Sequence, residues 1–477
     1  MRNNSLKFNI ILSSIHQLLT LFLPLVTAPY VSRVLGAEGT GIFSYTSSIQ
    51  AYFTLFAALG TGVYGVREIA RKRNNKKQYS TLFWEIELLT VLTSSVAIIL
   101  WLLWAIFSKE FQLIYLILTL NLFAVLFDIS WFYTGLEQFV YTIGLNALFK
   151  IFGTIAIFTF IKEPSDLNTY IFIIASTSLL SSISLWIYLP KILVKVSLNT
   201  LSLKGHLKQT LIYFVPTIAT SIYTVLDKTM IGVITQNANE NGYYEQATKI
   251  VNILKSITFT ALNSVLGARI AYLFSEKKYD EIKSRIALSL DFIFFIGMAF
   301  FFGLLSVSET FVPIFFGQGY DQVIYLLYVF SPIVVIIGVS NCLGSQYYTP
   351  AGLRSQSAKY IIIGSVFNLL LNLVFIPVFR SKGAVISSVL AESLITFLYV
   401  KNSNGYVDFK QLASYFNPRF IAGFIMYLII LFIKQYLPND LLGLLIQVLI
   451  GGMTYFMITY LQKDNILQIL KAKISKR

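Results

Sequence analysis

The sequence predicts an all-α polytopic membrane protein with about fourteen transmembrane helices. Three observations support this fold class. Of the 477 residues, 56% are hydrophobic and only 12% are charged, with a mean hydropathy of +0.71, whereas a soluble protein has roughly a quarter charged residues. The apolar residues fall in blocks as long as a membrane-spanning helix. The basic residues gather in alternate loops between these blocks.

The apolar blocks place the expected helices in order along the chain. Their bounds are 8–32, 42–66, 81–107, 112–134, 142–161, 169–189, 210–236, 243–272, 286–308, 322–347, 360–378, 383–400, 419–436 and 441–461. The first block is too long for the apolar core of a signal peptide, so we expect it to be retained. The longest loop, 191–209, is too short to form a domain. Cys342 is the only cysteine, which excludes an internal disulfide.

The distribution of charge predicts the orientation in the membrane. One set of alternate loops, together with both termini, holds roughly 26 lysines and arginines, with Arg419 counted among them at the edge of its predicted span, and the other set holds roughly 6. Basic loops remain in the cytoplasm. We therefore expect both termini to be cytoplasmic. The net charge of +15 then needs no nucleic-acid partner, although it would attract the headgroups of membrane lipids.

The sequence contains no motif for a nucleotide or metal site. It has no Gly-x4-Gly-Lys-Ser/Thr loop, no His-Glu-x-x-His and no Cys/His spacing typical of a metal centre. His16 and His206 are the only histidines. We expect neither an enzyme nor an ATPase, and no bound cofactor. The energy for any work that the protein does would then come from substrate supply or from coupling to H⁺ or Na⁺.

Two weak internal echoes indicate a duplicated half. At an offset of 201 residues, the stretch that begins at Gly41 shares scattered identities with the stretch at Gly242. The sequence YTGL at 133–136 also matches YTPAGL at 348–353. Both echoes pair one span with the sixth span after it, so the halves would share one orientation. This predicts two six-helix bundles as a parallel repeat, 1–206 and 207–402, with two extra helices and a tail in 403–477.

Charged and polar residues inside the apolar blocks are the candidate functional residues. A charge at mid-bilayer costs at least about 2.5–3.5 kcal/mol and usually faces a cavity. Polar stripes on three spans, which include His16 and Asn263, predict a shared water-filled cavity. Within it we expect a pair between Asp227 and either Lys249 or Lys255. The candidate cavity residues are Arg33, Asp128, Lys150, Asp227, Lys228, Glu245, Lys249, Asn252 and Lys255.

Structural roles are alternative explanations for several of these residues. Glu245 and Lys249 have the spacing of a helix-stabilising pair, which is compatible with a cavity role. Arg33 would reach lipid headgroups as readily as a substrate. Lys150 would equally form a structural pair with Asp128 or contact a ligand.

Two further acidic residues, Glu85 and Glu87, lie near the start of a predicted helix. They are expected to be solvated.

Three stretches of the sequence carry a resemblance to a known family. They are PYVSRVLGAEGTGIF at 29–43, DKTMIG at 227–232 and GYYEQA at 242–247. With them the chain resembles the Wzx-type polysaccharide flippases of the MOP superfamily, which also holds the MATE drug exporters and the lipid II flippases. The resemblance covers essentially the whole chain. Arg33, Asp227, Lys228, Glu245 and Lys249 stand at positions of the family's motifs, whereas Asp128, Lys150 and Lys255 rest on the cavity argument alone.

The resemblance implies a MATE-like fold, with two six-helix bundles in a V around a central cavity and two further helices. It implies alternating access in a bacterial cytoplasmic (inner) membrane. The implied substrate is an undecaprenyl-pyrophosphate-linked oligosaccharide repeat unit, moved from the cytoplasmic to the outer leaflet for O-antigen, capsule or exopolysaccharide synthesis. The polymerase and the chain-length regulator of the same pathway are the expected protein partners.

Two other functions compete with this interpretation. A MATE-like exporter of small organic cations would need an excess of buried acids, whereas the deep acids and bases here roughly balance. A membrane enzyme such as a polysaccharide polymerase would need a large external loop, and the expected external loops are short.

Overall fold

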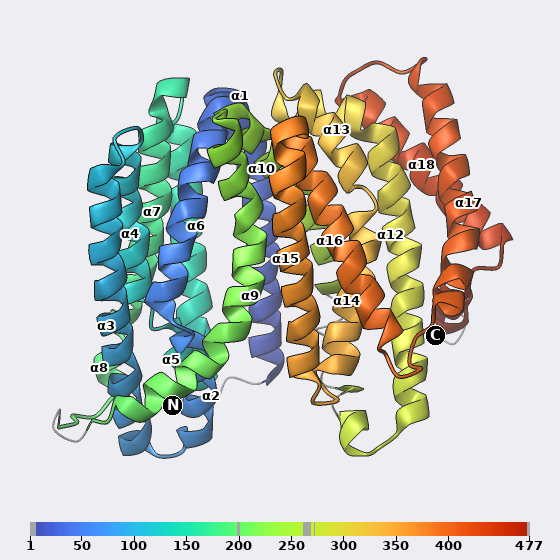
Figure 1. The fold of residues 1–477 in the computed structure, drawn as a ribbon. Helices are drawn as coiled ribbons and strands as arrows, with labels where there is room; N and C mark the ends of the chain where they lie inside the picture. Colours follow the sequence, from blue (N-terminus) through green and yellow to red (C-terminus); the bar gives the residue numbers. More distant parts are fainter. Residues whose placement is uncertain (1–5, 198–200, 261–268, 271, 475–477) are drawn as a thin grey trace. The chain divides into compact units, whose positions relative to one another are not determined.

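The computed structural model describes residues 6–197, 201–260, 269–270 and 272–474, and all regular structure in these ranges is helical (Figure 1). This confirms the all-α fold class. The chain forms two compact units, Met1–Thr229 and Met230–Arg477. We call them the N-terminal unit and the C-terminal unit. The division falls inside helix α9, Lys204–Thr235.

The helices of the N-terminal unit follow the order of the predicted spans. They are α1 (Leu6–Ala58), α2 (Thr61–Lys72), α3 (Lys76–Phe107), α4 (Gln112–Leu126), α5 (Ser130–Gly135), α6 (Phe139–Phe160), the 3₁₀ turn η1 (Pro164–Asp166), α7 (Leu167–Ser184), the 3₁₀ turn η2 (Leu185–Ile187), α8 (Leu189–Ile192) and most of α9.

The C-terminal unit contains the remaining helices. They are α10 (Ala238–Lys255), the π-helical turn η4 (Ser256–Thr260), α12 (Tyr279–Phe316), α13 (Asp321–Phe330), α14 (Ile333–Leu343), the π-helical turn η5 (Gly344–Tyr348), α15 (Arg354–Phe379), α16 (Ser381–Lys401), α17 (Phe409–Lys434), α18 (Leu441–Leu461) and α19 (Asn465–Ile474).

The number of membrane-spanning helices agrees roughly with the prediction. By length and composition, 10 helices in the described residues could cross a membrane, or up to 11 when the bent pair of α13 with α14 and η5 counts as one span. One of them, Phe22–Lys72, covers two predicted spans. It does so because the chain reverses at Gly36, whose φ of 68° lies in the left-handed region that glycine adopts at little cost. The two other predicted spans are 210–236, which corresponds to α9, and 243–272, which begins within α10 and η4. Residues 261–268 of the second span lie outside the described part of the chain.

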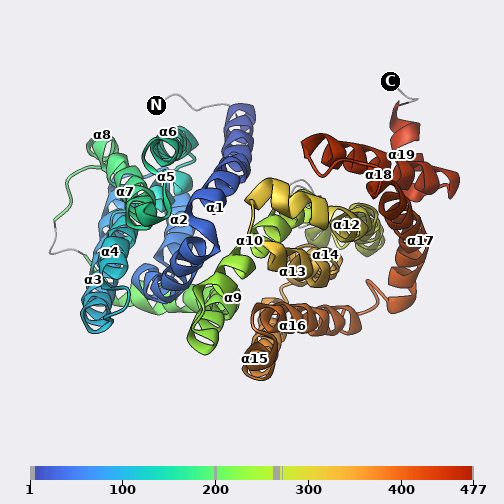
Figure 2. The same cartoon turned by 90° about the horizontal axis from the view of Figure 1, so that it is seen from above.

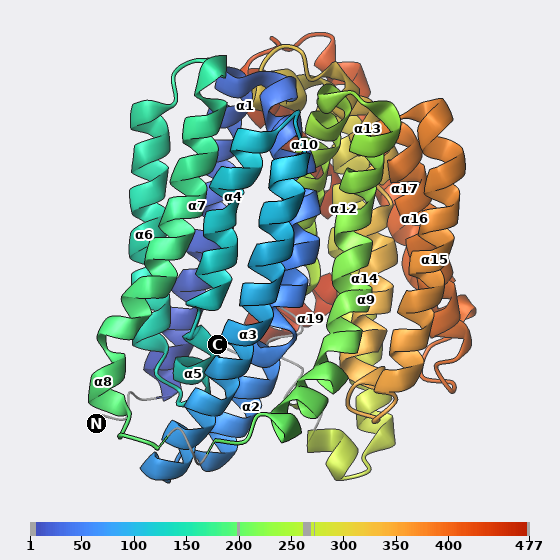
Figure 3. The ribbon, with the colours of Figure 1, turned by 60° about the vertical axis from the view of Figure 1, so that its left-hand side comes forward.

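The N-terminal unit packs its helices side by side. Helix α4 contacts α3 and α7, and α7 contacts α6 (Figure 3). The centre of this packing contains Trp101, whose indole N–H donates to the Tyr115 carbonyl at 3.0 Å. A second apolar cluster at one end of the unit is largely aromatic, with Phe83 stacked on Trp131. The Trp131 indole N–H has no hydrogen-bond partner among the described residues, unlike that of Trp101. Packing of the buried aromatic rings holds these long helices at fixed rotations.

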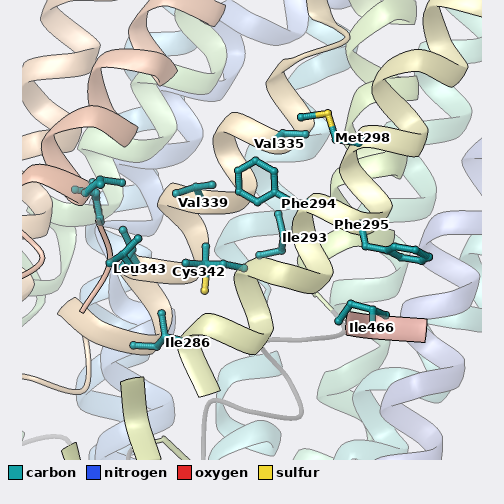
Figure 4. Close-up of a cluster of buried hydrophobic side chains, with 14 of the residues drawn as sticks. Ile286, Ile293, Phe294, Phe295, Met298, Val335, Val339, Cys342, Leu343 and Ile466 are labelled. Carbon is teal, nitrogen blue, oxygen red and sulfur yellow. The ribbon is translucent and has the colours of Figure 1, made fainter. Parts of the chain in front are cut away.

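The C-terminal unit is built around α12. This helix contacts α14, α17 and α18, and α15 pairs with α16 as a helical hairpin (Figure 2). Ile293 and Phe294 of α12 face Val339 and Cys342 of α14 in the main apolar cluster, where Cys342 is a buried free thiol (Figure 4). The two C-terminal helices α17 and α18 are thus attached to the unit through α12.

Two corners with the same backbone geometry support the predicted repeat. Tyr133 and Tyr348 are both fully buried. Each carbonyl accepts an N–H from five residues later at 2.8 Å, from Gln138 and Leu353 respectively. Each hydroxyl donates to a backbone carbonyl of a later segment, Leu185 at 2.6 Å and Tyr399 at 3.0 Å. The sequence echo at these tyrosines therefore corresponds to a shared helix-ending motif.

The hairpin of α15 and α16 depends on a glycine at its tip, which yields a first prediction. A Cβ at Gly383 would lie 2.3 Å from the Phe375 carbonyl oxygen, so the Gly383→Ala substitution must move backbone. We expect it to destabilise the protein by about 1–3 kcal/mol. The apparent Tm of the purified protein in detergent measures this.

The matched control is Gly452→Ala in α18. Nothing lies within 4 Å of a Cβ at this position. Because alanine is favoured over glycine inside a helix, the control should raise stability by about 0.5–1 kcal/mol. Equal Tm values for the two variants would contradict the close approach of α15 and α16.

Candidate functional site

The N-terminal unit contains a cavity of about 500 Å³ between its helices. Polar side chains contribute much of its lining, although it lies between apolar helices. The lining residues are Gln50, Ala51, Thr54, Leu55, Asn121, Ala124, Val125, Asp128, Ser178, Ser182 and Val225. They come from α1, α4, α7, α9 and the end of α4 at Asp128.

Asp128 is the predicted site residue that lines this cavity. It follows the end of α4, where the helix breaks, and its carboxylate accepts the Ser130 N–H at 2.9 Å. The carboxylate therefore accepts the first backbone N–H of the next short helix, α5, and is held at the cavity wall. This placement explains a charge between two apolar segments, because a helix break leaves backbone N–H groups that need an acceptor.

An amide network lies beside Asp128. The Gln50 side-chain amide donates to the Thr54 hydroxyl at 3.3 Å and to the Leu118 carbonyl at 3.5 Å. The Asn121 amide in turn donates to Gln50 Oε1 at 3.5 Å. The sequence analysis did not select these residues. Uncharged polar side chains are common within apolar blocks. Only their position on helices that face each other could have indicated this network.

Lys150 does not form the structural pair with Asp128 that was one of its two expected roles. Its ammonium group donates to the Thr20 hydroxyl at 3.4 Å, from α6 to α1. The side chain is half-buried. The second expected role, contact with a ligand, remains a prediction.

The motif residues Arg33, Asp227 and Lys228 lie on α1 and α9 of the N-terminal unit. Arg33 is exposed near the end of the first predicted span. Asp227 is only 4% exposed, and it interacts electrostatically with the Tyr52 hydroxyl. That hydroxyl also bonds to Thr229 at 3.1 Å, so α9 is tied to α1 close to Asp227. Lys228, one residue later, is half-buried.

The C-terminal unit contains the other four predicted residues, all on α10. Lys249 and Glu245 form the i, i+4 ion pair, with Nζ and Oε1 3.5 Å apart. This confirms their pairing. The Lys249 side chain is 34% exposed, and Asn252 is exposed as well. One face of α10 is thus polar and accessible, whereas Gln246 and Ala247 on another face are completely buried.

Lys255 lies at the end of α10, where the helix changes to the π-helical turn η4. Single π-helical turns frequently occur at functional sites. Glu392 of α16 interacts electrostatically with Lys255. The expected pair of Asp227 with Lys249 or Lys255 joins residues of different units and stays a prediction. Of the expected polar stripes, the His16 side chain and Asn263 lie outside the described part of the chain.

The expectation that Glu85 and Glu87 are solvated was wrong. Glu85 is 8% exposed; its carboxylate lies 3.0 Å from His206 Nε2 and accepts the Ser202 N–H at 2.9 Å. It thereby holds the segment that leads into α9. Glu87 is 2% exposed, and both of its oxygens lack a hydrogen-bond partner among the described residues. Sequence position suggested a helix start, but α3 begins earlier, at Lys76.

Arg419 was expected to be one of the basic loop residues that set the orientation, and this was also wrong. It lies within α17 and is 2% exposed. Its guanidinium bonds to Asp291 at 2.6 Å and to Asp464 at 2.8 Å. Arg419 is therefore a buried structural charge, which binds α17 to α12 and to the segment before α19.

Comparison with known proteins identifies the family. Residues 6–274, more than half of the chain, match the model of the polysaccharide biosynthesis protein family. A protein of Escherichia coli K12 named for O-antigen transport is 26% identical over 410 residues, which cover 84% of this chain and 97% of that protein. Agl15 of Haloferax volcanii, named as a flippase of low-salt glycan biosynthesis, is 25% identical over 242 residues and 50% of each chain.

Solved structures of the same fold come from the MOP superfamily. The inward closed form of the lipid II flippase MurJ matches with a TM-score of 0.77 and 16% identity, over 96% of this chain and 100% of that chain. An inward-facing MATE multidrug transporter matches with a TM-score of 0.62 and 14% identity, over 85% and 98%. The relatives are transporters and flippases, in agreement with the expectation of a transport protein. This polytopic membrane protein belongs to the polysaccharide biosynthesis protein family, with the MOP-superfamily fold that its resemblance to Wzx-type flippases implied.

Proposed function

We propose that this protein is a flippase for undecaprenyl-pyrophosphate-linked oligosaccharide repeat units, which it moves from the cytoplasmic to the outer leaflet by alternating access. The family and the names of the two relatives support transport of a lipid-linked glycan. The observation that carries the proposal is the accessible ammonium group of Lys249 on α10, a helix that the sequence predicts to lie in the membrane. It lies about 18 Å along α10 from the N-cap Asn237, close to half the thickness of the hydrocarbon layer.

The chemistry of the substrate explains why a lysine is needed at this depth. A pyrophosphate with a sugar head cannot enter hydrocarbon unaided, because each charge there costs several kcal/mol. An ammonium group has three N–H donors. The Glu245 carboxylate is 3.5 Å from Lys249 Nζ, so the pair leaves donors for phosphate oxygens. Lys255, Arg33 and Lys228 are further candidates for the same role, and Asp128 and Lys150 for contact with the sugar.

Coupling to H⁺ or Na⁺ is part of the proposal. The N-terminal cavity presents the oxygen atoms of Asp128, Gln50 and Asn121, which are the ligand type of hard cations. The buried carboxyl group of Glu87 favours H⁺ over Na⁺ as the coupling ion. A buried carboxyl group without a hydrogen-bond donor costs less when it carries a proton than when it is charged.

The proposal places the protein in the bacterial inner membrane with both termini in the cytoplasm, as the loop charges predict. Its partners would be the polymerase and the chain-length regulator that use the translocated repeat unit. The polymer would be O-antigen, capsule or another exopolysaccharide.

Deletion of the gene tests the proposal. We expect undecaprenyl-pyrophosphate oligosaccharide to accumulate several-fold on the cytoplasmic leaflet of membrane vesicles of known orientation, because transport across the hydrocarbon layer is the blocked step. Lipid-linked sugars extracted after labelling from each side of the vesicles measure this. The same vesicles with a proton or sodium ionophore identify the coupling ion.

A different result of the deletion experiment would contradict the proposal. An unchanged lipid pool together with sensitivity of the cells to cationic dyes would replace the flippase by an exporter of small organic cations.

A further inference from the structure

A groove lies at the end of the last membrane helix, outside the candidate site. It encloses about 450 Å³ between the end of α18 and the start of α19. Figure 2 shows where these two helices lie in the fold. Its lining residues are Tyr460, Leu461, Lys463, Asp464, Leu467, Gln468 and Lys471. We propose that this groove binds the headgroup phosphate of an anionic phospholipid, through the ammonium groups of Lys463 and Lys471.

The position of the groove fits a lipid headgroup. The groove begins where the apolar helix α18 ends, at the depth of a membrane boundary. Leu461 and Met457 on α18 are 68% and 63% exposed, so an apolar surface for acyl chains adjoins the lysines. Tyr460 stands at the transition, which is where tyrosine is enriched in membrane proteins.

Helix α19 has the character of an interfacial helix. Ile466 and Leu467 are buried against the C-terminal unit, and Leu470 continues this apolar face with 49% of its surface exposed. Its other side is polar, with Gln468 and Lys471. From Lys463 to the last residue, the sequence contains five basic residues and one acidic residue, Asp464. Such basic amphipathic segments are attracted to anionic membrane surfaces.

The one acidic residue of the groove is occupied by internal bonds. Asp464 Oδ2 bonds to the Arg419 guanidinium at 2.8 Å, and Oδ1 accepts the Ile466 N–H at 2.9 Å. Asn465 bonds to Asp291 of the same cluster at 2.7 Å. Both Asp464 oxygens therefore bond to groups other than the two lysines. Neither lysine forms an ion pair within the part of the chain that the structure describes.

The fold positions the side chain of Lys471 and the backbone of Lys463. Lys471 Nζ lies 5.9 Å from the centre of the Tyr460 ring, which orients its side chain across the groove. Lys463 has a φ of 55°, and its N–H bonds to the Tyr460 carbonyl at 3.0 Å. This left-handed position after a helix normally holds glycine. The lysine here carries backbone strain that glycine would relieve.

The Lys463 position gives a test that does not depend on folding. Lys463→Gly removes the charge and relieves the strained backbone, so the variant should be at least as stable as the natural protein. Lys471→Gln removes the second charge from an exposed helix position. We expect each change to weaken binding of phosphatidylglycerol about five-fold, and the double variant about 25-fold.

A matched control exists in the same unit. Lys277 also has a φ of 55° after a helical segment, and Lys278 N–H bonds to the Leu273 carbonyl at 3.1 Å, as Asp464 N–H bonds to Thr459. Lys277 is exposed but does not line the groove. Lys277→Gly removes the same charge and the same strain, and it should bind phosphatidylglycerol as the natural protein does.

The measurement is native mass spectrometry of the full-length protein in detergent, titrated with phosphatidylglycerol, with phosphatidylcholine or with inorganic phosphate. The proposal is supported if the natural protein and the Lys277→Gly variant prefer phosphatidylglycerol and the double variant does not. Equal binding by the double variant, or equal loss in the control, would overturn it. Saturation by inorganic phosphate at the same concentration would also overturn it, by showing a site for free phosphate.

Discussion

Replacing Arg419 with methionine is expected to destabilise the C-terminal unit by about 3–5 kcal/mol, the largest effect of any single change considered. The guanidinium bonds to the Asp291 and Asp464 carboxylates at 2.6 and 2.8 Å, and all three residues are at most 8% exposed. Methionine fills similar volume but leaves two buried carboxylates without their counter-charge. The apparent Tm in detergent and the amount of protein in the membrane measure the loss.

Two further variants separate charge from packing. Lys410→Met, an exposed position on the same helix α17, should leave the Tm unchanged. The triple variant with Arg419→Met, Asp291→Asn and Asp464→Asn should recover most of the lost stability, because it removes the unpaired charges and asparagine can still cap α19. If Arg419→Met alone has the Tm of the natural protein, the buried cluster makes no net contribution to stability.

The second large effect concerns transport. Lys249→Ala and Asp227→Asn should each lower surface polysaccharide about ten-fold or more, because the first removes the proposed pyrophosphate-binding ammonium group and the second the buried charge of a predicted cavity residue. The fold should survive both changes. The Glu245–Lys249 pair is an i, i+4 contact at a partly exposed position, worth only about 0.3–0.5 kcal/mol. Asparagine has nearly the size of the buried Asp227 side chain.

The readout is the amount of surface polymer divided by the amount of flippase in the membrane, each detected with an antibody. Lys359→Ala, an exposed lysine on α15, is the control for loss of one positive charge and should keep normal polymer. Normal polymer from both Lys249→Ala and Asp227→Asn would remove these residues from the mechanism. A parallel fall in flippase amount would mean that the charges serve folding.

The helices were predictable from the sequence because the hydrocarbon of the membrane requires helical structure. A segment of about twenty apolar residues in hydrocarbon must satisfy its backbone internally, and a helix is the available solution. Even the corner at Tyr133 and Tyr348 was visible, because the helix-ending motif needs the same residue types in both halves. The family resemblance came from contiguous stretches in the same way.

The tertiary structure alone decided which polar groups meet. Gln50 and Asn121 are 71 residues apart, and Arg419 lies 128 residues from Asp291. Whether such pairs face each other depends on the rotation and packing of long helices, which the hydrophobic pattern of each helix does not specify when lipid and protein core are both apolar. For this reason the sequence placed Arg419 in a loop and Glu85 in water, whereas the packed helices bury both.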